Sequence, residues 1–117
     1  MNDLEKQVQK LRLSQIKHHI FICADQTKAK CCDKDFSIEV WEYLKTRLAS
    51  IKLDVTIHRT KVDCLRVCKA GPIMAIYPRG VWYHSVDKIA IDKIIDQHLL
   101  NNSIVKENLL AISDTTN

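Results

Sequence analysis

The sequence lacks several features that define familiar protein classes. It has only two glycines and two prolines in 117 residues, with no internal repeat and no low-complexity linker, so we expect a single folded domain. No uninterrupted apolar run approaches the roughly 20 residues that a membrane-spanning helix needs. The amino-terminal stretch Met1-Asn2-Asp3-Leu4-Glu5-Lys6 has no apolar segment typical of a secretory signal. We therefore expect a cytoplasmic protein.

The chain also lacks a large excess of positive or negative charge. The formal net charge is +4, and acidic and basic residues are interspersed over much of the chain. No basic block with interleaved aromatic residues supports nucleic-acid binding. We expect no nucleic-acid or membrane partner.

Cysteine is the residue type that indicates a metal site or redox chemistry. Five cysteines in a reducing compartment do not form stable structural disulfides, and an odd number leaves one thiol unpaired in any scheme. Metal ligation or redox chemistry is therefore the leading interpretation. The cysteines are Cys23, Cys31, Cys32, Cys64 and Cys68.

Hydrophobic periodicity predicts the secondary structure in chain order. It indicates a weakly docked helix over 3–16, a buried strand over 19–23, a helix over 36–51, a strand over 53–58, a hairpin of strands 73–77 and 81–84, and a last helix over 87–100. A strand–helix–strand unit implies parallel strands, and the hairpin adds two antiparallel ones. The predicted fold is α/β (α+β) and thioredoxin-like, a four-stranded mixed β-sheet with flanking helices.

Two of these helices carry clear apolar stripes and acidic N-cap candidates. Asp33 or Asp35 is expected to cap the middle helix and Asp87 the last one. The strand over 53–58 is expected to place Leu53, Val55 and Ile57 on one face. The buried stripes are predicted to be Phe36, Val40, Trp41, Leu44, Leu48 and Ile51, and Ile91, Ile94, Ile95, His98 and Leu99.

The chain divides into three predicted parts. Residues 1–17 form an N-terminal helical extension and residues 18–101 the thioredoxin-like domain. Residues 102–117 form a C-terminal tail that is partly disordered, because the pattern fades after Asn102 and small polar residues end the chain.

The cysteine spacing suggests one four-thiolate site. Cys23, Cys32, Cys64 and Cys68 follow the pattern C-x8-C-x31-C-x3-C. If the first two strands are parallel, the loops after them leave the same sheet edge and bring these thiols together. Gly71-Pro72 lets the backbone pass close to such a site.

Three kinds of protein remain compatible with this spacing. Iron–sulfur ligation is favoured over zinc by a modest margin, because structural zinc sites prefer two to four residues between the members of each pair. A zinc-stabilised interaction module therefore stays an alternative. A thiol-disulfide oxidoreductase is a second one, although a Cys-x-x-Cys motif is missing.

The sequence resembles the thioredoxin-like [2Fe-2S] ferredoxins, which are related to the small [2Fe-2S] subunit of NADH dehydrogenase. The resemblance covers residues 19 to 100 and is carried by HIFICADQ, by KCCDKDFSIEVWEYLK, by CLRVCKAGPIMAIYPRGVWY and by the final helix. It implies that Cys23, Cys32, Cys64 and Cys68 bind the irons of a [2Fe-2S] cluster, with Cys31 a possible alternate. No residue is expected to be catalytic.

The same resemblance implies a function. The protein is expected to be a one-electron carrier between a reductase and an acceptor protein, often as a homodimer. Trp82 and Tyr83 are adjacent in a strand, so one is expected to pack inside and the other to face outward, where it could join a dimer interface. Cations near the ligands favour an acidic redox partner; these are Lys28, Lys30, Lys34, Arg66 and Lys69.

Overall fold

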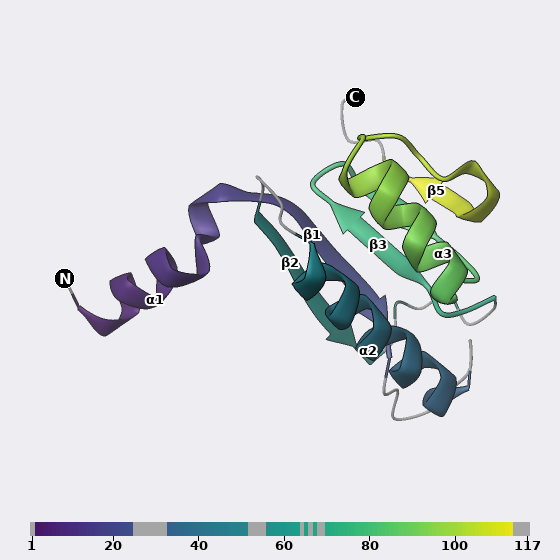
Figure 1. Cartoon of the computed structure of the whole chain (residues 1–117), viewed down its shortest axis with the longest axis horizontal. Coiled ribbons are helices and arrows are strands. Elements are labelled where there is room, and N and C mark those ends of the chain that lie inside the picture. Colours follow the sequence, from purple (N-terminus) through teal and green to yellow (C-terminus); the bar gives the residue numbers. More distant parts are fainter. Residues whose placement is uncertain are drawn as a thin grey trace.

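The structure is a computed structural model that describes residues 2–24, 33–51, 56–63, 65, 67 and 70–113. Its centre is a five-stranded mixed sheet with the strand order β2-β1-β3-β4-β5 (Figure 1). The strands are β1 (Ile16–Cys23), β2 (Thr56–Val62), β3 (Met74–Tyr77), β4 (Val81–Tyr83) and β5 (Leu109–Ile112).

The pairing of β1 confirms the predicted topology. β1 runs parallel to β2 and antiparallel to β3, and β3 forms an antiparallel hairpin with β4. The connection from β1 to β2 contains helix α2 (Lys34–Ser50), as expected for parallel neighbours. The fold class is therefore the predicted one.

Strand β5 is a correction to the predicted sheet of four strands. It pairs antiparallel with β4, with Val81 opposite Ile112 and Trp82 opposite Ala111. It follows a short 3₁₀ helix, η3 (Lys106–Asn108), inside the segment that the sequence assigns to a tail. The sequence Leu-Leu-Ala-Ile is too short to reveal a period, and pairing with the outer side of β4 makes it a strand. The division into three parts at 17 and 101 stays a prediction.

Strand β2 lies further along the chain than its sequence suggests. Residues 53–58 were expected to form it, but it extends through the polar stretch to Val62. The parallel pairing with β1 explains this extension, because every residue from His58 to Val62 has a partner on β1. Leu53 and Val55, which were expected to share a face with Ile57, lie outside the described residues, and Ile57 packs against the core.

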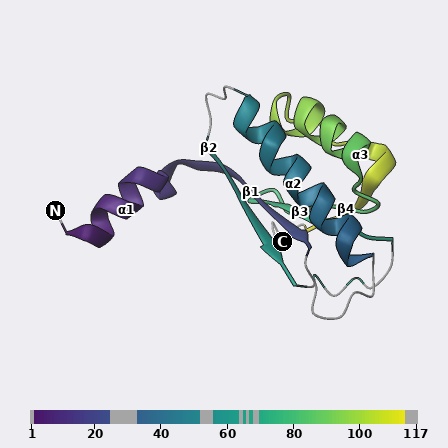
Figure 2. The same ribbon diagram turned by 60° about the horizontal axis from the view of Figure 1, so that its bottom comes forward.

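Two helices lie side by side on one face of the sheet (Figure 2). Helix α2 begins at the predicted cap Asp33, whose side chain accepts the N–H of Asp35. Helix α3 (Lys88–Lys93) begins at Asp87, whose carboxylate accepts the Ala90 N–H at 2.8 Å. It continues as a π-helix, η2 (Ile94–Leu99).

The core between the helices and the sheet contains most of the predicted stripes. All five residues predicted for the last helix are buried. In α2 the residues Val40, Trp41 and Leu44 are buried, whereas Phe36 in the first turn is 38% exposed and Ser37 is buried in its place. The sheet contributes Ile20, Ile22, Met74, Ile76, Val81 and Tyr83.

Helix α1 (Asp3–Leu11) projects away from the sheet (Figure 1). None of its residues is buried, and Leu4 is 73% exposed. A 3₁₀ turn, η1 (Leu13–Gln15), joins it to β1, and the His58 imidazole contacts the Leu11 carbonyl at 2.8 Å. The exposed helix agrees with the weakly docked N-terminal helix that the sequence predicts, but it ends at Leu11 rather than at Ile16, which is the first residue of β1. Among the described residues, no helix is long and apolar enough to cross a membrane.

Candidate metal centre

Cys23 is the last residue of β1, and its side chain is completely buried. It exchanges two hydrogen bonds with Ile73, just before β3. The Cys23 N–H donates to the Ile73 carbonyl at 3.1 Å, and the Ile73 N–H donates to Cys23 Sγ at 3.0 Å. The sulfur is therefore held in a fixed position by main-chain groups from a distant part of the sequence.

The sheet topology brings the segments with the other cysteines to this same edge. Because β1 and β2 are parallel, both end there, with Cys23 opposite Val62. Strand β3 begins at the same level, since Met74 pairs with Ile22. The chain between Ala24 and Asp33 and the chain between Val62 and Met74 therefore both leave from and return to the edge that holds Cys23.

The remaining predicted ligands lie outside the described residues; they are Cys32, Cys64 and Cys68, together with the possible alternate Cys31. In the part of the chain that the structure describes, no group of three or more metal-ligating side chains occurs. The ligand set thus stays a prediction. The structure gives the position of Cys23, one of the four predicted ligands. It also shows how described residues on both sides of the other three are held.

The segment after Cys68 is anchored by main-chain hydrogen bonds to residues beyond β4. The Ser85 N–H donates to the Ala70 carbonyl at 2.7 Å, and the Val86 N–H donates to the Pro72 carbonyl at 3.1 Å. The Gly71–Pro72 peptide bond is cis, and Pro72 is buried. Ile73, Ser85 and Val86 make these contacts through backbone atoms, so no side-chain signal in the sequence identifies them.

The chemistry at Cys23 fits an iron–sulfur cluster. A thiolate ligand carries negative charge, and a main-chain N–H directed at the sulfur stabilises that charge without adding a competing ligand. Burial excludes water from the sulfur. A cluster bound at such a site accepts and releases one electron, whereas the protein supplies ligands, hydrogen-bond donors and shielding from solvent.

His18 and His19, consecutive residues of β1, point to opposite faces of the sheet. His18 points to the helix-covered face and is buried next to His98, with ring centroids 5.6 Å apart. His19 points to the opposite face, where its Nε2 contacts Thr60 Oγ1 at 2.8 Å and its ring stacks on Phe21. Burial and the nearby Lys17 lower the pKa of His18, while burial and His58 lower the pKa of His19. The two consecutive rings diverge, as the strand geometry predicts.

Trp82 and Tyr83 also diverge as predicted. Tyr83 is fully buried in the core, whereas Trp82 is half-buried on the sheet face opposite α2 and α3. The Trp82 Nε1–H donates to Tyr77 Oη at 3.2 Å, and the Tyr77 ring lies edge-on to Phe21. We call Phe21, Tyr77 and Trp82 the aromatic face.

Comparisons with known proteins give the same family from sequence and from structure. The chain is 33% identical over 95 residues to a [2Fe-2S] ferredoxin of Clostridium pasteurianum, covering 77% of this chain and 92% of that protein. It is 30% identical over 98 residues to a putative 2Fe-2S ferredoxin of Priestia megaterium, covering 84% and 73%. A thioredoxin-like [2Fe-2S] ferredoxin structure from Aquifex aeolicus superposes with a TM-score of 0.75 at 25% identity, covering 85% of this chain and 94% of that one. No family model matches the chain.

These relatives agree with the fold. The C. pasteurianum relative is matched over nearly its whole length, so the similarity is not confined to a shared motif. The protein binds a [2Fe-2S] cluster and carries electrons. The chain belongs to the thioredoxin-like [2Fe-2S] ferredoxins.

Proposed function

We propose that Cys23, Cys32, Cys64 and Cys68 bind the two irons of the cluster, with Cys31 as an alternate for Cys32. The observation that carries this proposal is the buried Cys23 sulfur, which accepts the Ile73 N–H at 3.0 Å. Strands β1 and β2 end at the same edge of the sheet, and the other three cysteines follow these strands in the sequence. The order C-x8-C-x31-C-x3-C supplies four thiolates, which is the number that a [2Fe-2S] cluster takes.

In this proposal the protein has no substrate chemistry of its own and passes one electron from a reductase to an acceptor protein. Cys23 lies at an edge of the sheet, where β1 and β2 both end, and electron transfer needs only close approach of the partner. Lysines near the ligands in sequence favour a partner with an acidic docking surface. Five thiols are compatible with the reducing conditions of the cytoplasm, which is the proposed location.

The ligand set is tested by anaerobic purification of the holoprotein and of single Cys→Ser variants. The wild type should contain about two irons and two acid-labile sulfides per chain and should bleach in the visible range on one-electron reduction. Cys23→Ser, Cys64→Ser and Cys68→Ser should lose or shift the visible spectrum and the electron paramagnetic resonance signal of the reduced state. Cys31→Ser is the matched control and should keep both. A Cys23→Ser protein with the wild-type spectrum would contradict the assignment, and one zinc without sulfide would exclude the cluster.

The protein is further proposed to form a homodimer through the aromatic face. This face is free of helices in the described chain and contains three half-buried aromatic rings, a residue type enriched at protein interfaces. Trp82→Asp should shift the holoprotein from dimer to monomer in sedimentation experiments, without loss of the visible spectrum. Ile89→Asp, at an exposed position on α3, is the control and should leave the oligomeric state unchanged. A monomeric wild type would exclude the dimer.

A further inference from the structure

The edge strand β2 presents cations beside the strand that ends in Cys23. In the parallel register Arg59 pairs with Ile20, Lys61 with Ile22, and Val62 with Cys23. A strand rises about 3.3 Å per residue, so Arg59 lies only about 10 Å along β2 from Val62, the residue opposite Cys23. Both Arg59 and Lys61 are exposed. The strand itself, Thr-Ile-His-Arg-Thr-Lys-Val, contains no acidic residue.

A third cation from helix α2 joins this edge through Trp41. The Arg59 guanidinium carbon lies 5.8 Å from the centre of the Trp41 ring, and Lys45 Nζ lies 5.6 Å from the same ring. Trp41 is buried, with 8% of its surface exposed, and thus forms a rigid base between α2 and β2. A cation over an aromatic face is stabilised by the ring quadrupole, which offsets part of the repulsion between two like charges near one ring. We call Lys45, Arg59 and Lys61 the basic edge.

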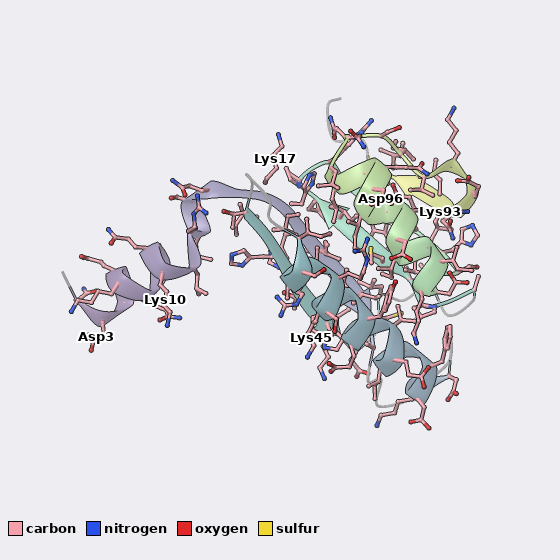
Figure 3. The ribbon with its side chains drawn as sticks, viewed as in Figure 1. Asp3, Lys10, Lys17, Lys45, Lys93 and Asp96 are labelled. Carbon is pink, nitrogen blue, oxygen red and sulfur yellow. The ribbon has the colours of Figure 1, made fainter. Side chains whose placement is uncertain are left out.

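Acidic residues also occur beside the basic edge. Glu42 forms an ion pair with Lys45, with Nζ and Oε1 3.0 Å apart, and Asp63 follows β2 at an exposed position. Side chains of Lys45 and Glu42 are 33% and 59% exposed, so water screens their ion pair. Figure 3 shows Lys45 pointing outward from α2, on the body of the protein and away from the projecting helix that contains Lys10.

We propose that the basic edge is the docking site for an acidic face of the redox partner protein. This proposal rests on the proposed function, in which the cluster is bound beside Cys23. The three cations come from α2 and β2, and two of them, Lys45 and Arg59, lie over the Trp41 ring. Strand β2 pairs with β1, which ends in Cys23. An acidic partner attracted to them is guided to the side of the sheet where β2 pairs with the strand that ends in Cys23. Opposite charges across such an encounter increase the association rate and lose their effect as salt is added.

The test uses two small oxidants of opposite charge and the intact holoprotein. In stopped-flow experiments the dithionite-reduced protein is mixed with ferricyanide, a trianion, or with hexaamminecobalt(III), a trication. One electron passes from the reduced protein to ferricyanide, which becomes ferrocyanide, or to cobalt(III), which becomes cobalt(II). No proton is transferred. Second-order rate constants are measured from about 10 mM to about 500 mM ionic strength, over which screening becomes nearly complete.

The test variant is Arg59→Glu/Lys61→Glu, and the matched control is Lys6→Glu/Lys10→Glu. The control makes the same change in net charge at exposed positions on α1, the helix that projects away from the sheet (Figure 1). At low salt the test variant should lose about three- to tenfold in rate with ferricyanide and gain with hexaamminecobalt(III). The control should change both rates by less than about twofold. At high salt all proteins should react alike.

Several outcomes would contradict the proposal that the basic edge is a docking site. Equal effects of the test and control variants would mean that net charge alone steers the oxidants. Unchanged rates in the test variant would mean that the basic edge does not face the route to the cluster. Arg59→Gln/Lys61→Gln repeats the test if charge reversal impairs folding, and it should give a smaller change of the same sign. The visible spectrum, recorded first, separates these outcomes from failure of the proposed function, since a protein without a cluster shows no bleaching at all.

Discussion

Tyr83 Oη and His98 Nδ1 lie 2.6 Å apart in the protein core, where both side chains are completely buried. Tyr83 Oη also accepts the Val105 N–H at 3.2 Å, so this hydroxyl joins the His98 ring to the main chain of Val105. The other ring nitrogen of His98, Nε2, is buried and has no hydrogen-bond partner among the described residues. This pair links β4 to the π-helix η2 and to the segment that leads to β5.

His98 should make stability depend on pH in the acidic range. Burial, together with the nearby charges of His18 and Arg79, lowers the pKa of His98 from 6.5 to about 4. The unfolded chain therefore binds a proton that the folded protein excludes. The stability contribution is complete above pH 6.5 and is lost as the pH falls from 6.5 towards 4, by no more than about 3 kcal/mol.

The measurement is urea unfolding of the holoprotein between pH 7.5 and pH 5. Wild type should lose stability over this range more steeply than His98→Gln, which cannot be protonated. His84→Gln is the control, because His84 is only partly buried and contacts Ser85. Parallel pH profiles for wild type and His98→Gln would show that His98 is not the group responsible.

Tyr83→Phe should destabilise the protein although it removes only one oxygen atom. The change leaves the Val105 N–H and His98 Nδ1 without their partner inside the core. A buried unsatisfied polar group costs about 1–3 kcal/mol. Urea unfolding measures this loss of free energy, with Tyr77→Phe as the control because Tyr77 is half-buried and water can replace its contact with Trp82. Equal losses for the two variants would contradict this account.

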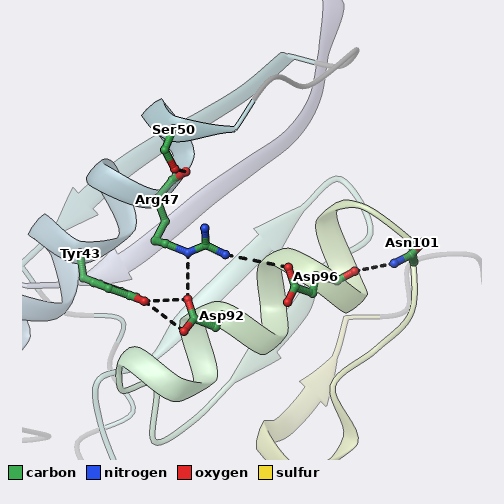
Figure 4. A network of polar contacts seen from close by, with 6 residues as sticks. All are labelled: Tyr43, Arg47, Ser50, Asp92, Asp96 and Asn101. Atoms are coloured by element: carbon green, nitrogen blue, oxygen red, sulfur yellow. Dashed lines mark hydrogen bonds and ion pairs between the residues drawn. The ribbon is translucent and has the colours of Figure 1, made fainter.

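Asp92 connects the two helices that cover the sheet (Figure 4). Its carboxylate accepts the Tyr43 O–H at 2.8 Å and the Arg47 Nε–H at 2.9 Å. The hydrogen bond to Asp92 also raises the pKa of Tyr43 and that of Arg47. Asp92→Asn should lower the thermal unfolding midpoint slightly, since these side chains are partly exposed and screened.

Asp96→Asn is the matched control for Asp92→Asn. Asp96 is 66% exposed, and its Oδ1 lies 3.9 Å from Arg47 Nη2, which is a weaker contact (Figure 4). Its midpoint should stay at the wild-type value in differential scanning calorimetry. A larger shift for Asp96→Asn than for Asp92→Asn would mean that the interhelical contact is centred on Asp96.

Gly80→Ala should weaken the attachment of β5. Gly80 has φ of +75°, a conformation that strains residues with a side chain, and an added Cβ would lie 2.9 Å from Ser113 Cβ. The Gly80 carbonyl also accepts the Ser113 N–H at 2.7 Å, at the end of β5. A loss of about 1–2 kcal/mol is expected in urea unfolding, with faster amide hydrogen exchange in Leu109–Ile112.

Ser113→Gly in the Gly80→Ala background separates the two causes of this loss. It removes the Cβ that would clash, so part of the stability should return, while the strain of a positive φ remains. Wild-type exchange rates in β5 after Gly80→Ala alone would show that this turn does not hold the strand.

Elements with a local signal in the amino-acid sequence could be predicted before the structure. Asp33 and Asp87 precede helices as capping residues, and both cap them in the structure. The stripe from Ile91 to Leu99 repeats at helical spacing and is buried throughout. The hairpin around Pro78-Arg79-Gly80 and the fold class also follow from turn residues and periodicity. The cysteine spacing and its resemblance to known ferredoxins indicated the cluster.

Other features depend on contacts between residues that are distant in the sequence, and these features appear only in the folded chain. Leu109–Ile112 has no periodicity of its own and becomes β5 because β4 offers unpaired main-chain groups. The polar residues Arg59 and Lys61 belong to a strand because β1 pairs with them. The Ile73 N–H reaches Cys23 Sγ, 50 residues away in the chain, because β3 lies antiparallel to β1. Main-chain hydrogen bonds of this kind leave no trace in side-chain identity, so no sequence pattern could predict them.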